Sequence, residues 1–336
     1  MSTVLFCGPQ YLNLNEKAGG VFKEMELRAE ALNSVGWNVQ YLRQDQTPDW
    51  DNISLVHVFM ANESTYGLVK LLKEKKKVVV SPIIDRTEKE SHLRILINIM
   101  SKIPKMHSNL TRAKDICNLS DEVVIRSSEE KRKLNIAFGV DGGVVVKLPY
   151  KRVDLTEEEI TLKVTKRQVF FLGDLGNERK NVHRLIQACD ELGVNLVLAG
   201  VIGNDQYSKK VKTLISQSET TQYLGKITES EKYKLLLESE VFCLPSLMEG
   251  VGIAALEALD LHCKVIISKN GGARDYFLDA VQYVNPNSLD DMKTKISAAL
   301  NNKEKPECGD VFDALNLNKI GLETINVYKK VLCNEI

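Results

Sequence analysis

Apolar residues along the chain fall into two patterns, short continuous runs and sets at helical spacing. The continuous runs predict buried strands at residues 4–7, 39–42, 54–60, 77–84, 121–128, 168–172, 194–200, 223–227, 241–244 and 264–268. The helically spaced sets predict helices at residues 21–32, 65–75, 230–239, 253–261 and 318–332. Because strands and helices alternate, the pattern is typical of an α/β protein with parallel sheets.

The length of 336 residues is typical of two domains. The charged stretch 156–167 separates the last predicted strand of the first half from the first strand of the second. We therefore expect an N-terminal domain at residues 1–155 and a C-terminal domain that begins at residue 156.

Composition narrows the class of protein. The chain has 45 basic and 45 acidic residues, and this zero net charge argues against a nucleic-acid-binding protein. No apolar run approaches the ~20 residues of a membrane span, and the N-terminus lacks the charged start of a signal peptide. The seven cysteines include no Cys-x-x-Cys pair, which is typical of a reduced, cytoplasmic protein.

The loop at residues 248–252, sequence MEGVG, carries the strongest functional pattern. It lies between a predicted strand and a predicted helix, in the arrangement where a helix N-terminus holds a phosphate. The free backbone amides of Gly250, Val251, Gly252 and Ile253 and the positive end of the helix dipole would face that phosphate.

Two glutamates flank this loop and helix. Glu249 and Glu257 are eight residues apart, which corresponds to roughly 12 Å along a helix. A diphosphate fits in that gap, and each carboxylate could accept hydrogen bonds from the hydroxyls of a sugar or a ribose. The alternative is a tight turn with two solvated glutamates.

The segment PSLMEGVGIAALEAL, followed by KVIISKNGG, resembles the signature of the retaining glycosyltransferases of the large nucleotide-sugar family four. The resemblance implies the GT-B fold, in which two Rossmann-like domains face each other across a cleft. It implies an acceptor domain at residues 1–155, completed by a C-terminal helix at 318–336, and a donor domain at 156–317. It also implies that Glu249 contacts the transferred sugar and that Glu257 binds the ribose.

A second segment, GDLGNERKN, resembles the family's loop in which an arginine and a lysine grip the diphosphate. Lys180 matches the lysine and Gly173 begins the loop, whereas Asp174 stands where the arginine usually is. Arg179 is the candidate substitute, and the alternative is a surface Arg-Lys pair. The segment YLGKI, which ends at Ile227, resembles the short strand whose backbone reads the nucleotide base.

In the N-terminal half, Gly19 and Gly20 lie before a predicted helix and resemble the family's paired glycines at the donor; the alternative is an ordinary helix-start loop. The family's sugar-contacting His-Asp is only half present, because Ile84 precedes Asp85. His57 lies in a strand, where a lone histidine is more often a core residue.

The resemblance implies a hexosyltransferase-like enzyme that moves a sugar from a UDP- or GDP-sugar to an acceptor hydroxyl, with retention of configuration and with no metal or other cofactor. The motif Asp49-Trp50-Asp51 has the form of a metal site but lies in a turn. The acceptor stays open among glycan, lipid, protein and small molecule. One alternative is a non-catalytic GT-B partner or nucleotide-binding subunit, and a weaker one is a nucleotide-sugar epimerase.

Residues 86–114 mix apolar and basic positions. This pattern most often belongs to helices that pack on their own domain. The alternative is an acceptor-facing surface or a peripheral contact with the inner face of a membrane.

Overall fold

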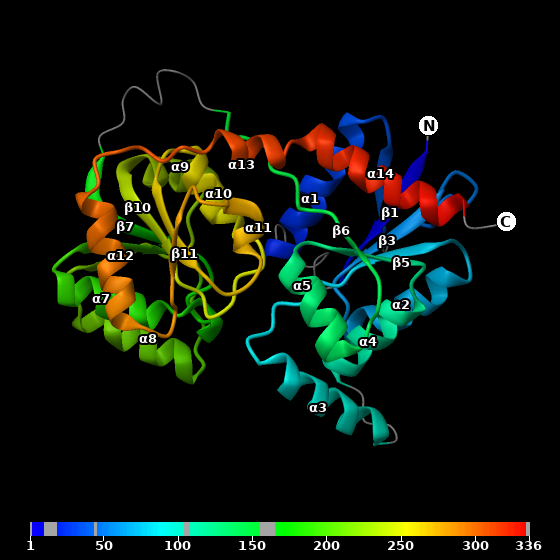
Figure 1. Cartoon of the computed structure of the whole chain (residues 1–336), viewed down its shortest axis with the longest axis horizontal. Helices are drawn as coiled ribbons and strands as arrows, with labels where there is room; N and C mark the ends of the chain where they lie inside the picture. The colour runs from blue at the N-terminus through cyan, green and yellow to red at the C-terminus, as the bar shows by residue number, and fades with distance from the viewer. Residues whose placement is uncertain (1, 10–18, 44–45, 104–107, 155–164, 334–336) are drawn as a thin grey trace. The chain divides into compact units, whose positions relative to one another are not determined.

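The computed structural model (Figure 1) describes residues 2–9, 19–43, 46–103, 108–154 and 165–333. The chain divides into two compact units. The N-terminal unit comprises Met1–Lys151 together with Asp313–Ile336, and the C-terminal unit comprises Arg152–Phe312.

The N-terminal unit is built on a parallel sheet with the strand order β2-β1-β3-β4-β5-β6 in the described residues. Its strands are β1 (Thr3–Cys7), β2 (Asn38–Tyr41), β3 (Leu55–Phe59), β4 (Val78–Ser81), β5 (Glu122–Ile125) and β6 (Val144–Val145). The order changes direction between β1 and β3, which is the point where open α/β sheets usually bind ligands.

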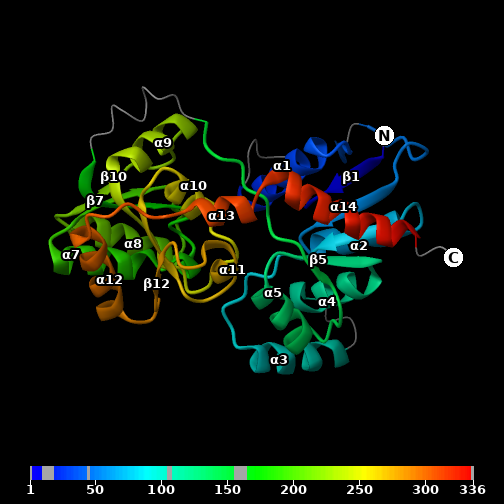
Figure 2. The same ribbon diagram turned by 45° about the horizontal axis from the view of Figure 1, so that its top comes forward.

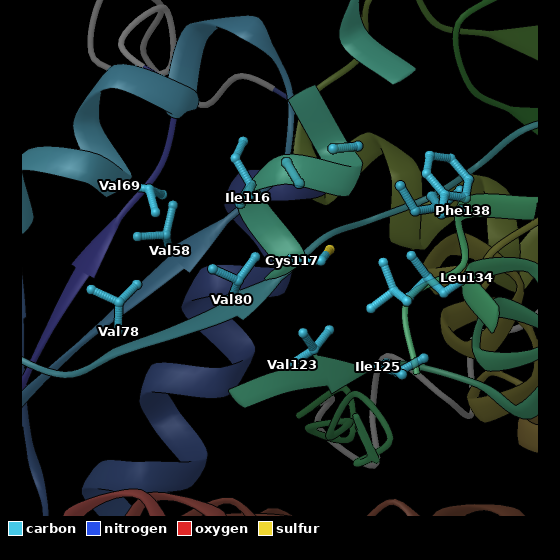
Figure 3. Packing of buried hydrophobic residues seen from close by; sticks show 14 of the residues in the cluster. Val58, Val69, Val78, Val80, Ile116, Cys117, Val123, Ile125, Leu134 and Phe138 are labelled. Carbon is cyan, nitrogen blue, oxygen red and sulfur yellow. The ribbon is translucent and has the colours of Figure 1, made fainter. Parts of the chain in front are cut away.

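Helices cover both faces of this sheet. One face packs against α1 (Gly19–Ser34) and α14 (Leu317–Cys333). The other packs against α2 (Glu63–Lys73), α3 (Glu90–Lys102), α4 (Asn109–Leu119) and the π-helical turn η2 (Leu134–Phe138), which follows α5 (Ser128–Lys133). Figure 3 shows part of the second core, where Val58 from β3 and Val80 from β4 lie near Ile116 from α4.

The last helix, α14, belongs structurally to the first unit, and Figures 1 and 2 show it beside α1. A Cβ added at Gly321 would lie 2.2 Å from the carbonyl oxygen of Ala31, so the two helices approach more closely than a side chain would allow. His57 is fully buried and hydrogen-bonds with Tyr328 of α14 at 2.6 Å and with Ser81 at 2.8 Å. His57 is therefore a core residue.

The C-terminal unit also has a parallel sheet, with the strand order β12-β11-β10-β7-β8-β9 in its described part. Its strands are β7 (Lys166–Leu172), β8 (Asn195–Ala199), β9 (Thr221–Tyr223), β10 (Ser239–Leu244), β11 (Lys264–Ser268) and β12 (Gln282–Val284). Here the chain order reverses between β7 and β10. The loops that follow these two strands therefore flank the expected ligand crevice.

The connecting segments of this unit are the 3₁₀ turn η3 (Glu178–Lys180) and the helices α7 (Val182–Leu192), α8 (Gln206–Gln217), α9 (Glu229–Glu238), α10 (Ile253–Asp260), α11 (Ala273–Phe277) and α12 (Leu289–Asn301). Figure 2 shows α7, α8 and α12 on one side of the sheet and α9 and α10 on the other. The short helix α13 (Gly309–Ala314) follows α12 and crosses the boundary between the units.

The structure corrects three details of the sequence-based prediction. The strand predicted at 223–227 is β9, which ends at Tyr223, so Ile227 lies in the segment before α9. Gly19 and Gly20 do not precede a helix but are the first residues of α1. Helix α8 was not predicted, because its sequence QYSKKVKTLISQ is mostly polar. Residues 10–18, which precede Gly19 and Gly20 in the chain, lie outside the described residues.

Within residues 86–114 the structure describes α3 and the first part of α4. Among the helices that the structure describes, none is long and apolar enough to cross a membrane.

Candidate functional site

The loops after β7 and β10 are joined to each other at the carboxyl ends of their strands. The amide of Leu247 donates to the carbonyl oxygen of Arg179 at 2.7 Å. The side-chain amide of Asn181, which begins α7 in the left-handed conformation, donates to the carbonyl oxygens of Pro245 and Pro286 at 3.0 and 2.8 Å. These bonds fix the positions of Lys180 and Glu249 relative to each other.

Glu249 and Lys180 form an ion pair at this point of the sheet. Lys180 Nζ lies 2.8 Å from Glu249 Oε2, and the hydroxyl of Ser246 donates to the same oxygen at 2.7 Å. Arg179 Nη1 lies 4.0 Å from that oxygen and donates to the carbonyl of Met248 at 2.7 Å. The Glu249 side chain is 9% exposed, so its negative charge is balanced by nearby cations rather than by bulk water.

The backbone of Glu249 is held by the turn after β11. The amide of Glu249 donates to Asn270 O at 3.1 Å, and the amide of Gly272 donates to Glu249 O at 3.0 Å. Between them, Gly271 forms a β-bridge with Glu249. This turn therefore fixes the backbone of Glu249, and with it the point from which the side-chain carboxylate extends.

Helix α10 begins immediately after the loop, at Ile253 as predicted. Gly252 precedes it with a φ of +83°, a conformation that favours glycine. The first amides of a helix have no acceptor within the helix. The amides at this start and the cations of Lys180 and Arg179 all belong to the loops that follow β7 and β10, the two strands between which the chain order reverses.

Glu257, on the same helix, has a different partner. Its Oε1 lies 2.7 Å from Nζ of Lys232, a residue of α9, and both side chains are nearly buried. Burial lowers the pKa of Lys232, but the carboxylates of Glu257 and Glu229 outweigh it, so the pKa is raised above its usual value. The solvated-glutamate interpretation is wrong, because Glu249 and Glu257 are each 7% exposed when the whole residue is counted and 9% exposed in their side chains.

Other predicted residues are placed as follows. Gly173 follows β7 directly, and its amide donates to Ala199 O at 3.1 Å. Asp174 is exposed and its carboxylate accepts from the amide of Gly176 at 3.0 Å, which is a local turn contact. Ile227 is half-buried, outside the paired loops. Gly19 and Gly20 are exposed and belong to the N-terminal unit.

Sequence reasoning missed Ser246, Asn270 and Lys232. Ser246 is three residues before Glu249, a spacing that could have indicated the contact. Asn270 donates to Leu247 O at 3.0 Å and supports the loop from β11. Lys232 has no signal in the sequence, because its pairing depends on how α9 and α10 lie on the sheet.

The N-terminal unit holds a buried charge cluster after β4 and β5. Arg126 contacts Glu24 and Asp85 at 2.8 Å and Glu130 at 3.0 Å. Burial lowers the pKa of Arg126, but the three carboxylates raise it by more, so it stays charged. Asp85, expected to match half of the family's His-Asp pair, is therefore an ion-pair partner of Arg126.

No group of three His, Cys, Asp or Glu side chains within the described ranges is arranged to hold a metal ion.

The two sheets, each with a ligand crevice predicted where its strand order reverses, define the class: an α/β protein with the GT-B fold. Residues 154–308, almost all of the C-terminal unit, match the family described as glycosyl transferases group 1. The C-terminal unit is therefore similar to the members of that family.

The similar proteins support the same class. An uncharacterized glycosyltransferase of Methanocaldococcus jannaschii is 26% identical over 180 residues, which is 49% of this chain and 45% of that protein. The chain thus matches less than half the length of its curated relatives.

Solved structures match nearly the whole chain. Sucrose-phosphate synthase from Thermosynechococcus elongatus has a TM-score of 0.69 at 14% identity, covering 99% of this chain and 97% of the other. HepE from Anabaena in complex with UDP and glucose has a TM-score of 0.62 at 15% identity, covering 98% of each chain. At these identities the likeness shows the fold.

Proposed function

We propose that this protein is a glycosyltransferase that moves a sugar from a nucleotide-diphospho-sugar to an acceptor hydroxyl, with retention of configuration and without a metal ion. The observation that carries the proposal is the Lys180–Glu249 pair between the β7 and β10 loops, beside the start of α10. The family match of the C-terminal unit and the UDP bound by HepE support a nucleotide-sugar donor.

The chemistry follows from the charges. As the bond between the anomeric carbon and the diphosphate oxygen breaks, its electron pair goes to the diphosphate. Lys180, Arg179 and the amides of Gly250 to Ile253 stabilise the negative charge that grows there. These protein groups replace the divalent cation that would otherwise neutralise the leaving group.

Glu249 acts at the other end of the breaking bond. Its carboxylate stabilises the positive charge that develops at the anomeric carbon. The acceptor oxygen forms its new bond on the face that the diphosphate leaves, and its proton passes to the departing phosphate oxygen. Glu257 binds the ribose hydroxyls, and the segment that ends at Ile227 contacts the base. The N-terminal unit binds the acceptor.

Turnover of UDP- and GDP-sugars tests the proposal. Release of the nucleoside diphosphate is measured with and without EDTA for the wild type, Glu249→Gln and Lys180→Ala. We expect losses of about 10²–10³-fold in each variant, with no effect of EDTA. The matched control is Lys166→Ala, which breaks an exposed Lys166–Glu238 pair at 2.6 Å in the same unit. Wild-type turnover in both site variants would refute the assignment.

A non-catalytic nucleotide-binding partner is the second candidate. The observation that favours it is Asp174, which stands where the family has a cation and instead caps a local turn. Protein that binds UDP or GDP in a thermal-shift assay but never releases it from any donor would support this candidate over the enzyme.

A peripheral membrane contact on the cytoplasmic face belongs to the same proposal. Helix α3 exposes Ile95, Leu96 and Ile99 beside the basic residues Arg94 and Lys102. Apolar side chains with interspersed cations favour an anionic lipid surface.

Co-sedimentation with phosphatidylglycerol and phosphatidylcholine vesicles measures this contact. Ile99→Ser on α3 should weaken binding to the anionic vesicles. Leu71→Ser on α2 is the control, because Leu71 is 64% exposed, compared with 54% for Ile99. Equal sedimentation with both lipids, or equal loss in both variants, would exclude the contact.

A further inference from the structure

The ion pair between Lys232 and Glu257 joins two helices that are adjacent only in the folded chain. Lys232 Nζ lies 2.7 Å from Glu257 Oε1 and 2.7 Å from Glu229 Oε2. Its ammonium also lies 4.5 Å from the centre of the Tyr233 ring. Lys232 therefore connects α9, the helix that carries Lys232 and Glu229, to α10, the helix that carries Glu257.

This pair differs from the surface pairs of the unit in its burial. The side chains of Lys232 and Glu257 are 7% and 9% exposed, whereas Glu229 is 66% exposed. A nearly buried carboxylate that loses a cation 2.7 Å away loses part of the interaction that favours its ionised form and holds its orientation. Lys232 therefore contributes to both the charge and the direction of the Glu257 carboxylate.

The start of α9 fixes where Lys232 lies. Thr228 and Glu231 form a capping box, in which the Glu231 amide donates to Thr228 Oγ1 at 3.2 Å and the Thr228 amide donates to Glu231 Oε2 at 2.7 Å. The residue before Thr228 is Ile227, the end of the segment assigned above to the base. The segment assigned to the base therefore leads directly into α9. Lys232 lies on this helix and forms the ion pair with Glu257.

We infer that Lys232 is a positioning residue that holds Glu257 ionised and oriented toward the ribose diol, and that it thereby sets the preference for ribonucleotides over deoxyribonucleotides. The inference rests on the proposed function, because it requires a nucleotide at Glu257. A carboxylate held in one orientation can accept hydrogen bonds from ribose hydroxyls. A nucleotide without those hydroxyls forms no such hydrogen bonds, so its affinity does not depend on how the carboxylate is oriented.

The test compares UDP and GDP with their 2′,3′-dideoxy forms by calorimetric titration of the full chain. In Lys232→Met we expect the affinity for the ribonucleotide to fall about tenfold to a hundredfold, as for a lost hydrogen bond to a charged group. The affinity for the dideoxy form should change by less than about threefold. Lys232→Arg should retain most of the discrimination, because it keeps the cation.

Two further variants keep the test decisive. Glu229→Gln removes the exposed second partner and should reduce discrimination slightly, even if Lys232→Met does not fold. Lys166→Met, which breaks the exposed pair with Glu238, should change neither affinity. Equal weakening of both nucleotide forms, or unchanged discrimination in both Lys232→Met and Glu229→Gln, would overturn the positioning role alone. A wild type that binds neither UDP nor GDP would overturn the proposed function as well.

Discussion

Replacing Gly271 with alanine should disable the site through the backbone of Glu249. Gly271 has a φ of +106°, and a Cβ built there lies 2.1 Å from the carbonyl oxygen of Glu249 and 2.9 Å from its carbonyl carbon. These atoms are backbone, so no side chain can rotate away. The two segments must separate by about 1 Å to reach ordinary van der Waals contact.

Gly271→Ala should lower both the folding stability and the turnover. A non-glycine residue in this conformation costs about 1–3 kcal/mol of folding stability. A shift of about 1 Å at the reacting groups lowers turnover by about 10²-fold. We therefore expect Gly271→Ala to fold with a melting temperature lower by several degrees, with turnover reduced about a hundredfold.

Thermal denaturation and donor turnover, measured on the same preparations, separate the two effects. Gly193→Ala is the matched control, because Gly193 has a φ of +62° but no described atom lies within 4 Å of its added Cβ. Both variants should lose stability, and only Gly271→Ala should lose turnover. Gly271→Ala with wild-type turnover would refute the reasoning that the 271 turn sets the position of Glu249.

Three further predictions concern stability, measured by urea denaturation. Tyr328→Phe removes the buried partner of His57 at 2.6 Å and should cost about 1–3 kcal/mol, so an unchanged midpoint would contradict the contact. Burial and nearby cations hold the pKa of His183 at about 4, below its unfolded value of about 6.5. Between these two pH values the unfolded chain binds more protons than the folded chain, so the free energy of unfolding should fall by up to about 1.4 kcal/mol per pH unit on acidification. His183→Gln should reduce this slope. Arg126→Met leaves buried carboxylates unpaired and should cost about 3–5 kcal/mol, and a variant as stable as the wild type would show that they protonate or rearrange freely.

Continuous apolar runs located the central strands well, because a strand that is buried on both faces needs apolar residues at nearly every position. The strand predicted at 264–268 is β11 (Lys264–Ser268), and the helix predicted from residue 253 is α10. The pattern overextended β9, since the apolar residues beyond Tyr223 belong to an irregular segment. It missed α8, because a helix with few buried positions carries little apolar periodicity.

The candidate site was predictable only in part. The residue types in the two loops indicated Lys180 and Glu249 as candidate site residues. In the structure, Lys180 Nζ lies 2.8 Å from Glu249 Oε2. Their proximity depends on the adjacency of β7 and β10, and spacing along the chain does not specify that adjacency. The pairing of Lys232 with Glu257 depends on helix placement in the same way, so the sequence could not reveal it.

The position of α14 has a consequence for biosynthesis. During translation the ribosome completes all of the C-terminal unit before it makes the helix that covers Val4, Phe6 and Phe59 of the N-terminal unit. The nascent first half therefore carries an open apolar face while the second half can already fold. We expect the part of the protein made first to be the last to reach its final structure.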